Sequence, residues 1–186
     1  GNKGSLEKRN RNNNVRIIVS SEDALEIAKQ NPDKTVNFLA VRFETTAPST
    51  AVIVKEAHQQ KIKNLQILSG HKLVVPAMRA LLKTKNSNID GFLCPGHVSA
   101  ITGYKAFQTI VDEFQKPCVV AGFDPMQIIE GLAEICRQIS ENNPQLTSIY
   151  KPVVTEEGNK KALAIMNEVF DTVDSYWRGL GQIENS

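Results

Sequence analysis

The chain has 186 residues, of which 41% are hydrophobic and 23% charged, and these values are ordinary for one globular domain. The 22 Lys and Arg residues against 20 Asp and Glu residues give a formal net charge of +2, with the two signs interleaved. This balance excludes the basic footprint of a nucleic-acid-binding or membrane-surface protein, so we expect neither nucleic acid nor membrane as a partner.

Apolar runs such as Leu73–Met78 are far shorter than the roughly 20 residues that span a bilayer, and residues 1–14 lack a signal-peptide core. We therefore expect a cytoplasmic protein. The chain starts with Gly1, and we expect its tail, 176–186, to lead toward a missing C-terminal segment. We accordingly expect a piece of a longer chain or a naturally short relative of one.

Short β-branched and apolar runs alternate with helical patterns, which is typical of right-handed βαβ units. The alternation predicts an α/β fold, a three-layer sandwich with a mostly parallel sheet of about five strands. This fold is Rossmann-like without a dinucleotide fingerprint. We expect a single domain over residues 15–175, preceded by a polar lead-in at 1–14. The predicted strands are Val15–Val19, Val36–Val41, Leu65–Leu68, Gly91–Cys94 and Cys118–Ala121.

Several helix starts can be read from the sequence. Ser20 and Asp23 predict a capping box before a helix that carries Ala24, Leu25, Ile27 and Ala28. Pro48 and Pro76 fall in the first turns of the next two predicted helices, where a missing N–H is tolerated. The remaining predicted elements are the helices Tyr104–Phe114, Pro125–Asn142 and Asn159–Phe170, and an edge strand within Thr147–Val154.

Polar side chains gather in the loops that follow the predicted strands. Ligands of open parallel sheets bind beyond the carboxyl ends of the strands, because free loops and helix N-termini meet there. The sequence therefore predicts a polar cleft at this edge. The candidate cleft-lining residues are Glu44, Thr45, Thr46, His71, Lys72, Pro95, Gly96, His97, Ser99 and Asp124.

Structural roles compete with ligand roles for several of these residues. The hydroxyls of Thr45, Thr46 and Ser99 stand before helical runs and equally suit helix caps. Asp124 precedes a proline, and for it the capping role is favoured. Glu44 is harder to explain as structural, because a carboxylate among apolar neighbours needs a partner if it is buried.

Structural roles also compete with ligand roles for the histidines and cysteines. His97 and His71 are candidates for hydrogen bonding, base chemistry or metal binding, although a backbone carbonyl equally satisfies a histidine such as His71. His58 lies in a charged helical stretch and is expected at the surface. For Cys118 and Cys136 core packing is favoured. Cys94, at a strand end, is a weak candidate for a metal ligand. With three cysteines 24 and 18 residues apart, a disulfide framework or a zinc finger is not expected.

Common enzyme motifs are absent from the sequence. No Gly-x-Gly-x-x-Gly, Gly-x-x-x-x-Gly-Lys-Ser/Thr or Gly-x-Ser-x-Gly pattern occurs, which disfavours nucleotide binding and serine hydrolysis. No complete catalytic set is recognised.

Taken together, three loop motifs are similar to a known family. Phe43–Pro48 (FETTAP), Pro95–Ser99 (PGHVS) and Ala121–Pro125 (AGFDP), in this order and spacing, resemble the hydrogenase maturation family HypD. Shorter matches at His71–Leu73 and Trp177–Gly181 support the resemblance, which covers the chain from about Val15 onward.

The resemblance implies a scaffold function. HypD proteins assemble the iron that carries cyanide and carbon monoxide, the Fe(CN)2CO centre of nickel–iron hydrogenases, together with the small chaperone HypC and other maturation proteins. By resemblance, the Glu44–Thr46 loop and His97 line the cleft at the assembly site. Full-length members also carry Cys-Gly-Thr-His and Cys-Pro-x-Cys motifs and a cysteine-rich part that holds a 4Fe-4S cluster.

None of those cysteine motifs is present in this chain. We therefore expect no cofactor and no stable iron–sulfur cluster on this chain alone, and a non-catalytic scaffold domain rather than a complete enzyme. Arg42 also departs from the family pattern, which has glycine before Phe-Glu-Thr-Thr. The alternative interpretation is a standalone small-molecule-binding or transferase domain that has lost the iron chemistry, in which Arg42 pairs with an anionic ligand.

Overall fold

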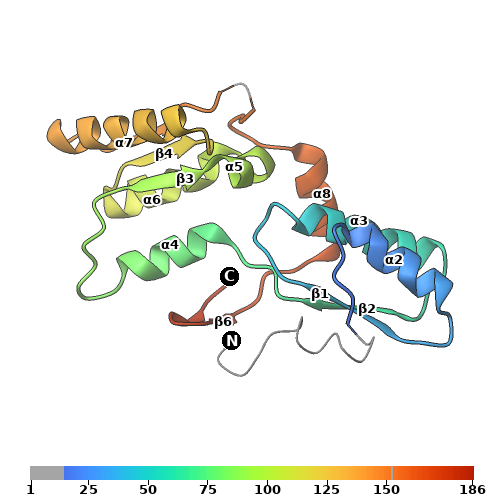
Figure 1. Cartoon of the computed structure of the whole chain (residues 1–186). Helices are drawn as coiled ribbons and strands as arrows, with labels where there is room; N and C mark the ends of the chain where they lie inside the picture. Colours follow the sequence, from blue (N-terminus) through green and yellow to red (C-terminus); the bar gives the residue numbers. More distant parts are fainter. Residues whose placement is uncertain (1–14, 152) are drawn as a thin grey trace.

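The computed structural model describes residues 15–151 and 153–186, so the predicted lead-in at 1–14 lies outside the described residues. Helices and strands alternate along these residues, and five strands pair in parallel in two small sheets. The two sheets, each with its own helices, form two groups joined by α4 and α8 (Figure 1). The predicted α/β class is confirmed, whereas the strands are divided between two sheets instead of forming one.

The first sheet pairs β1 (Val36–Ala40) with β2 (Leu65–Ser69) in parallel register. One face is covered by α2 (Ser21–Gln30) and α3 (Ala47–Gln59), whose Leu25, Ile53 and Ala57 form a core with Phe38, Leu65 and Ile67. On the opposite face Leu39 and Leu68 are exposed. Described residues therefore cover this sheet on one face only.

The second sheet has the order β3, β4, β5 and is also parallel. Val119 faces α7, while Cys94, Cys118 and Val120 face the helices on the other side, where Phe107 and Ile110 complete the core. This half is therefore a three-layer sandwich, as predicted. Its elements are β3 (Phe92–Pro95), α5 (Gly96–Thr102), the 3-10 helix η2 (Tyr104–Phe107), α6 (Gln108–Phe114), β4 (Cys118–Ala121), α7 (Pro125–Ser140) and β5 (Leu146–Ser148).

The remaining elements connect the two groups. Helix α4 (Val74–Leu82) places Met78 in the core of the second sheet, and α8 (Lys160–Val169) contacts both α3 and α5 (Figure 1). An antiparallel hairpin of β6 (Ser175–Trp177) and β7 (Gly181–Ile183) follows.

The predicted strand Val15–Val19 is wrong. This segment is irregular, and Ile17 and Val19 are 73% and 102% exposed. Its composition is typical of a strand, yet no strand of the described residues pairs with it, and a strand requires a ladder partner. The carboxylate of Asp23 instead accepts hydrogen bonds from Val19 N and Ser20 N, each at 3.1 Å.

The predicted helix starts are confirmed. Ser20 and Asp23 form a capping box at α2, and Pro48 and Pro76 lie in the first turns of α3 and α4. Asn159 caps α8, because its side chain accepts hydrogen bonds from the next turn's N–H groups. The predicted helix Tyr104–Phe114 divides into η2 and α6, and α5 was not predicted.

None of the helices in the described parts of the chain combines the length and the apolar composition that a bilayer crossing requires.

Candidate functional site

Glu44 lies in the loop between β1 and α3 and is 4% exposed. Its Oε1 accepts a hydrogen bond of 2.9 Å from Val74 N, at the first residue of α4. Its Oε2 is buried and has no hydrogen-bond partner among the described residues. Burial raises the pKa of this carboxyl, and the bond from Val74 N opposes the shift only in part. The partner that a buried carboxylate needs is thus supplied to Oε1 by the N-terminus of α4. The other oxygen, Oε2, receives no hydrogen bond from the described residues.

Thr46 stands at the N-cap of α3, but its hydroxyl makes no capping bond. The predicted capping role is therefore wrong for Thr46. Its Oγ1 is instead buried without a hydrogen-bond partner among the described residues. Thr45 is half-buried beside it. Two buried oxygens of one loop, from Glu44 and Thr46, thus lack hydrogen-bond partners in the part of the chain that the structure describes.

His71, after β2, faces the same loop. Its Nε2 lies 3.1 Å from Thr50 Oγ1, and its Nδ1 lies 3.4 Å from the carbonyl oxygen of Arg42. The ring meets Phe170 edge-on at 5.7 Å. Burial lowers the pKa of His71, which favours the neutral imidazole. The hydroxyl of Thr50 also donates to Thr46 O, so hydrogen bonds link Thr46, Thr50 and His71. Glu44 lies in the same loop as Thr46, and we call Glu44, Thr46, Thr50 and His71 the Glu44 group.

Lys72 and Phe43, the chain neighbours of His71 and Glu44, both contact Trp177. The ammonium of Lys72 lies 5.7 Å from the ring centroid of Trp177, and Phe43 is 6.0 Å from the same ring. From the sequence, Trp177 is part of the motif Trp177–Gly181 that supports the family resemblance, but it is not among the predicted site residues. The available signal was that this motif contains the chain's single tryptophan.

Arg42 is exposed, and its backbone is not among the positive-φ positions of the described chain. The glycine that the family pattern has here is therefore not needed for a left-handed conformation. The carbonyl of Arg42 accepts a hydrogen bond of 2.9 Å from Lys72 N, which joins the loops after β1 and β2.

A second set of candidates lies at the end of β3. Pro95 ends that strand, and Gly96 starts α5 so close to its neighbours that a Cβ would lie 2.5 Å from Tyr150 Cδ1 and 2.6 Å from Ala121 O. The exposed ring of His97 stacks on Phe123, with centroids 4.8 Å apart and an interplanar angle of 20°. Tyr150 lies 6.5 Å from the same imidazole. We call His97, Phe123 and Tyr150 the His97 group.

Ser99 and Asp124 have structural roles. Ser99 is fully buried inside α5 and donates a hydrogen bond of 3.0 Å to Pro95 O, so the prediction that it caps a helix is wrong. Asp124 accepts a hydrogen bond of 2.9 Å from Met126 N, which confirms its predicted role as the N-cap of α7.

Cys94 and Cys118 are buried in the core of the second sheet. A hydrogen bond with Cys118, together with burial, raises the pKa of the Cys94 thiol well above its ordinary value, which disfavours the thiolate that binds metals. Cys136 is exposed, so the prediction that it packs in the core is wrong. In residues 15–151 and 153–186 no three His, Cys, Asp or Glu side chains cluster as metal ligands, so these residues do not fit an iron–sulfur cluster.

The candidate residues therefore fall into two groups at the strand ends of two different sheets. In the described chain, hydrogen bonds join Thr46, Thr50 and His71 in the first group, and ring contacts join the three residues of the second. None of these contacts links one group to the other. His58 is exposed on α3, as predicted.

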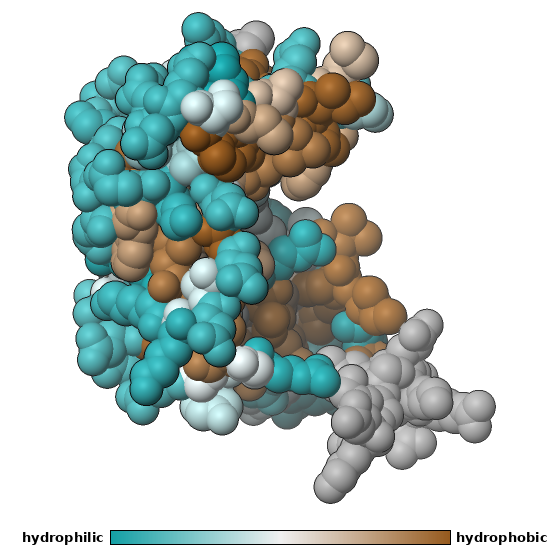
Figure 2. All heavy atoms as spheres, turned by 90° about the vertical axis from the view of Figure 1, so that its left-hand side faces the viewer, coloured by the Kyte–Doolittle hydropathy of each residue, from teal (hydrophilic) through white to brown (hydrophobic). Residues whose placement is uncertain are grey.

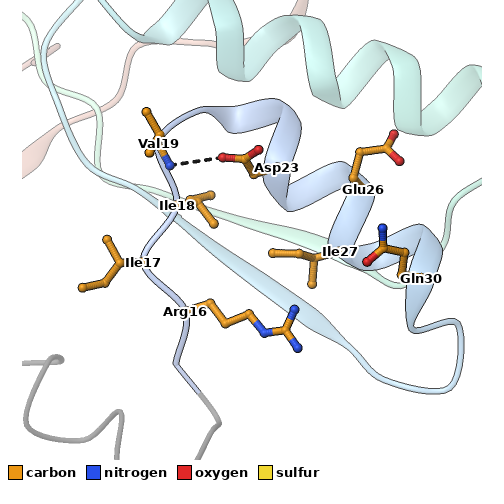
Figure 3. Close-up of a pocket in the computed structure, with 8 residues that line it drawn as sticks. All are labelled: Arg16, Ile17, Ile18, Val19, Asp23, Glu26, Ile27 and Gln30. Carbon is orange, nitrogen blue, oxygen red and sulfur yellow. Dashed lines mark hydrogen bonds between the residues drawn. The ribbon is translucent and has the colours of Figure 1, made fainter.

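A recess of about 350 Å³ lies elsewhere, between the segment Arg16–Val19 and α2. Figure 3 shows Asp23 at one end of it, bonded to Val19, and Ile27 beside it. None of the predicted site residues lines this recess.

Comparison with known proteins assigns the family. The family model described as "HypD: Hydrogenase formation hypA family" matches residues 1–186. The chain belongs to the HypD family. The predicted resemblance is thereby confirmed, and the three motifs FETTAP, PGHVS and AGFDP mark the loops at the strand ends in this HypD chain.

Curated HypD relatives align with nearly the whole chain. Hydrogenase maturation factor HypD of Escherichia coli is 38% identical over 188 residues, which cover all of this chain and 50% of that protein. Hydrogenase maturation factor HypD1 of Bradyrhizobium diazoefficiens is 36% identical over 179 residues, 92% of this chain and 47% of that protein. Hydrogenase maturation factor HypD of Rhodobacter capsulatus is 38% identical over 173 residues, which cover 92% of this chain and 46% of that protein. The chain spans about half the length of the curated relatives it matches.

Proposed function

We propose that this chain is the part of a hydrogenase maturation scaffold that contributes one wall of the cleft in which the Fe(CN)2CO centre is assembled. The observation that carries the proposal is a pair of buried oxygens in one loop, Glu44 Oε2 and Thr46 Oγ1, for which residues 15–151 and 153–186 provide no hydrogen-bond partner. Buried polar atoms without partners cost free energy, so they are retained where a ligand satisfies them.

The chemistry of these two groups suits the diatomic ligands of the cargo iron. The nitrogen of an iron-bound cyanide accepts hydrogen bonds. A carboxyl whose pKa is raised is more readily protonated, and the protonated form of Glu44 is a donor. The hydroxyl of Thr46 is a second donor. Both groups therefore suit a role in orienting cyanide while other parts of the scaffold hold the iron.

The thiolates that bind the iron are proposed to come from outside this chain. Cys94 and Cys118 are core residues, and Cys136 is exposed on α7. His71, held neutral beside Thr50, is proposed to position the loop. The exposed imidazole of His97, flat against Phe123, is proposed to line the opposite part of the cleft. This division describes a scaffold and not a complete enzyme.

The partners proposed for the chain are a HypC-type chaperone and other hydrogenase maturation proteins. The relatives are hydrogenase maturation factors, which supports partners within the maturation machinery. The interpretation based on Arg42 and an anionic ligand stays a prediction.

The test replaces the corresponding residues in a full-length HypD. Glu44→Ala combined with Thr46→Val, which removes both proposed donors, should lower the infrared cyanide and carbon monoxide bands of the purified scaffold at least severalfold. Hydrogenase activity in the producing cells should fall with them. Thr109→Val, which removes an exposed hydroxyl on α6, is the matched control and should leave both signals unchanged. Undiminished bands in the double variant, at equal protein level, would refute the role of this loop.

A further inference from the structure

Helix α7 presents an apolar stripe to solvent. Its buried face is formed by Gly131, Ile135 and Gln138. The outer face carries large apolar side chains spaced by three residues and, at its end, by seven, which is about two turns, so they lie along one side of the helix. They are Phe123 just before the helix, Met126, Ile129, Leu132 and Ile139, which are 70%, 61%, 60%, 49% and 45% exposed. We call these five residues the α7 stripe.

The α7 stripe is large for a solvent-exposed surface. At roughly 100 Å² of exposed area for each side chain, the stripe amounts to about 500 Å², near the upper end for the largest apolar patch of a monomeric protein. A partner covering it would bury about 1,000 Å² in total, which meets the size of a specific interface. Figure 2 shows hydrophobic atoms gathered at the top of the molecule, at the level of α7.

Charged residues run along one edge of the stripe. Glu130, Glu134 and Glu141 recur at helical spacing, and Arg137 between them pairs with Glu134 and Glu141. With the N-cap Asp124, the helix and its caps carry four carboxylates and one guanidinium, a net charge of −3 in a chain of net charge +2. A second copy of this chain, placed stripe to stripe, would bring like charges together.

A recess lies on the same edge. It measures about 420 Å³ and is lined by Glu130, Ala133, Glu134 and Arg137 of α7 and by Thr147 and Ile149 at the strand beside it. A recess next to an apolar stripe suits a protruding side chain of a folded partner. Because Phe123 also stacks on His97, a partner seated on the stripe would adjoin the His97 group.

We propose that the α7 stripe is the docking surface for a small folded partner protein that presents an apolar ridge bordered by lysine or arginine side chains. This inference rests on the proposed function, in which a HypC-type chaperone is a partner of the chain. The apolar contact supplies most of the affinity, and the acidic edge fixes the orientation and speeds association.

The test measures binding of a purified HypC-type chaperone to this chain by calorimetry. Ile129→Glu should weaken binding at least tenfold. Glu130→Lys, which changes the charge of the helix and its caps from −3 to −1, should weaken binding severalfold and reduce its dependence on salt. Leu68→Glu, an equally exposed apolar position on the open face of the first sheet, is the matched control and should bind as wild type does. Because all three positions are exposed, unchanged urea midpoints should show that the variants are folded.

The possible outcomes are distinguishable. Wild-type affinity in both α7 variants would overturn the docking surface and leave the proposed function standing. No binding of the chaperone to the wild-type chain would overturn both. Sedimentation of the wild-type chain alone should give a monomer, and a dimer that Ile129→Glu dissociates would overturn the inference in favour of a second copy.

Discussion

The buried carboxyl of Glu44 makes the stability of the folded chain depend on pH in a defined direction. Burial raises its pKa, so the folded chain holds this proton more tightly than the unfolded chain does. The resulting stabilisation is fully present below the ordinary glutamate pKa of about 4.3, and it is lost as the pH rises through the raised pKa. Glu44→Gln cannot ionise. We therefore expect the free energy of unfolding of Glu44→Gln to increase relative to that of the wild type as the pH rises above the ordinary glutamate pKa and through the raised one.

The hydrogen bond from Val74 N to Glu44 predicts a second effect, a difference in stability between two variants of Glu44. Glu44→Gln keeps an acceptor oxygen for this N–H, whereas Glu44→Ala leaves the N–H buried without a partner, at a cost of about 1–3 kcal/mol. We expect the alanine variant to be about 2 kcal/mol less stable than the glutamine variant. For a chain of this length that difference lowers the melting temperature by about 4–8 °C.

The assay is urea unfolding of the wild type, Glu44→Gln and Glu44→Ala, followed by far-ultraviolet circular dichroism at several pH values. His71 has a lowered pKa and acts in the opposite direction, but it is common to all three proteins and cancels in the differences. Equal stabilities of the two variants would refute the Val74 bond. A difference between Glu44→Gln and wild type that does not change with pH would refute the raised pKa.

Two further predictions concern the His97 group and the cysteines. Gly96→Ala should lower the free energy of unfolding by roughly 2–3 kcal/mol, because the new Cβ meets a backbone oxygen. Gly70→Ala, whose nearest contact is a side-chain carbon at 3.2 Å, should change it by about 0.5 kcal/mol or less. Equal urea midpoints of the two variants would contradict this. Anaerobic reconstitution with iron and sulfide should leave the chain without stoichiometric amounts of either, because Cys94 and Cys118 are core residues, and metal and acid-labile sulfide analysis would show the contrary.

Local signals predicted those elements whose structure depends on near neighbours. The strand Cys118–Ala121 has the predicted bounds because a fully buried parallel strand requires a continuous apolar run. The start of α7 follows from Asp124 and Pro125 in the same way. Helix α5 was missed because Pro95 and Gly96 are typical loop residues, although here they occupy its N-cap and first position.

The rest depends on contacts between distant segments, which composition does not encode. The partner of Glu44 is an N–H thirty residues further along the chain. Val15–Val19 has the composition of a strand but no neighbouring strand in the described chain. Cys136 is exposed because the buried face of α7 passes through Ile135, one residue earlier, and a helix turns 100° between them.

The ring of Trp177 supplies an optical probe of the Glu44 group. It is the chain's only tryptophan, and it lies 6.0 Å from Phe43, in the loop that holds Glu44, and 5.7 Å from the ammonium of Lys72. A nearby cation shifts and quenches indole emission, so movement of either loop changes the fluorescence of this one residue. Titration of small ligands can therefore be followed with unlabelled protein, and each signal is assigned to the first sheet without further substitutions.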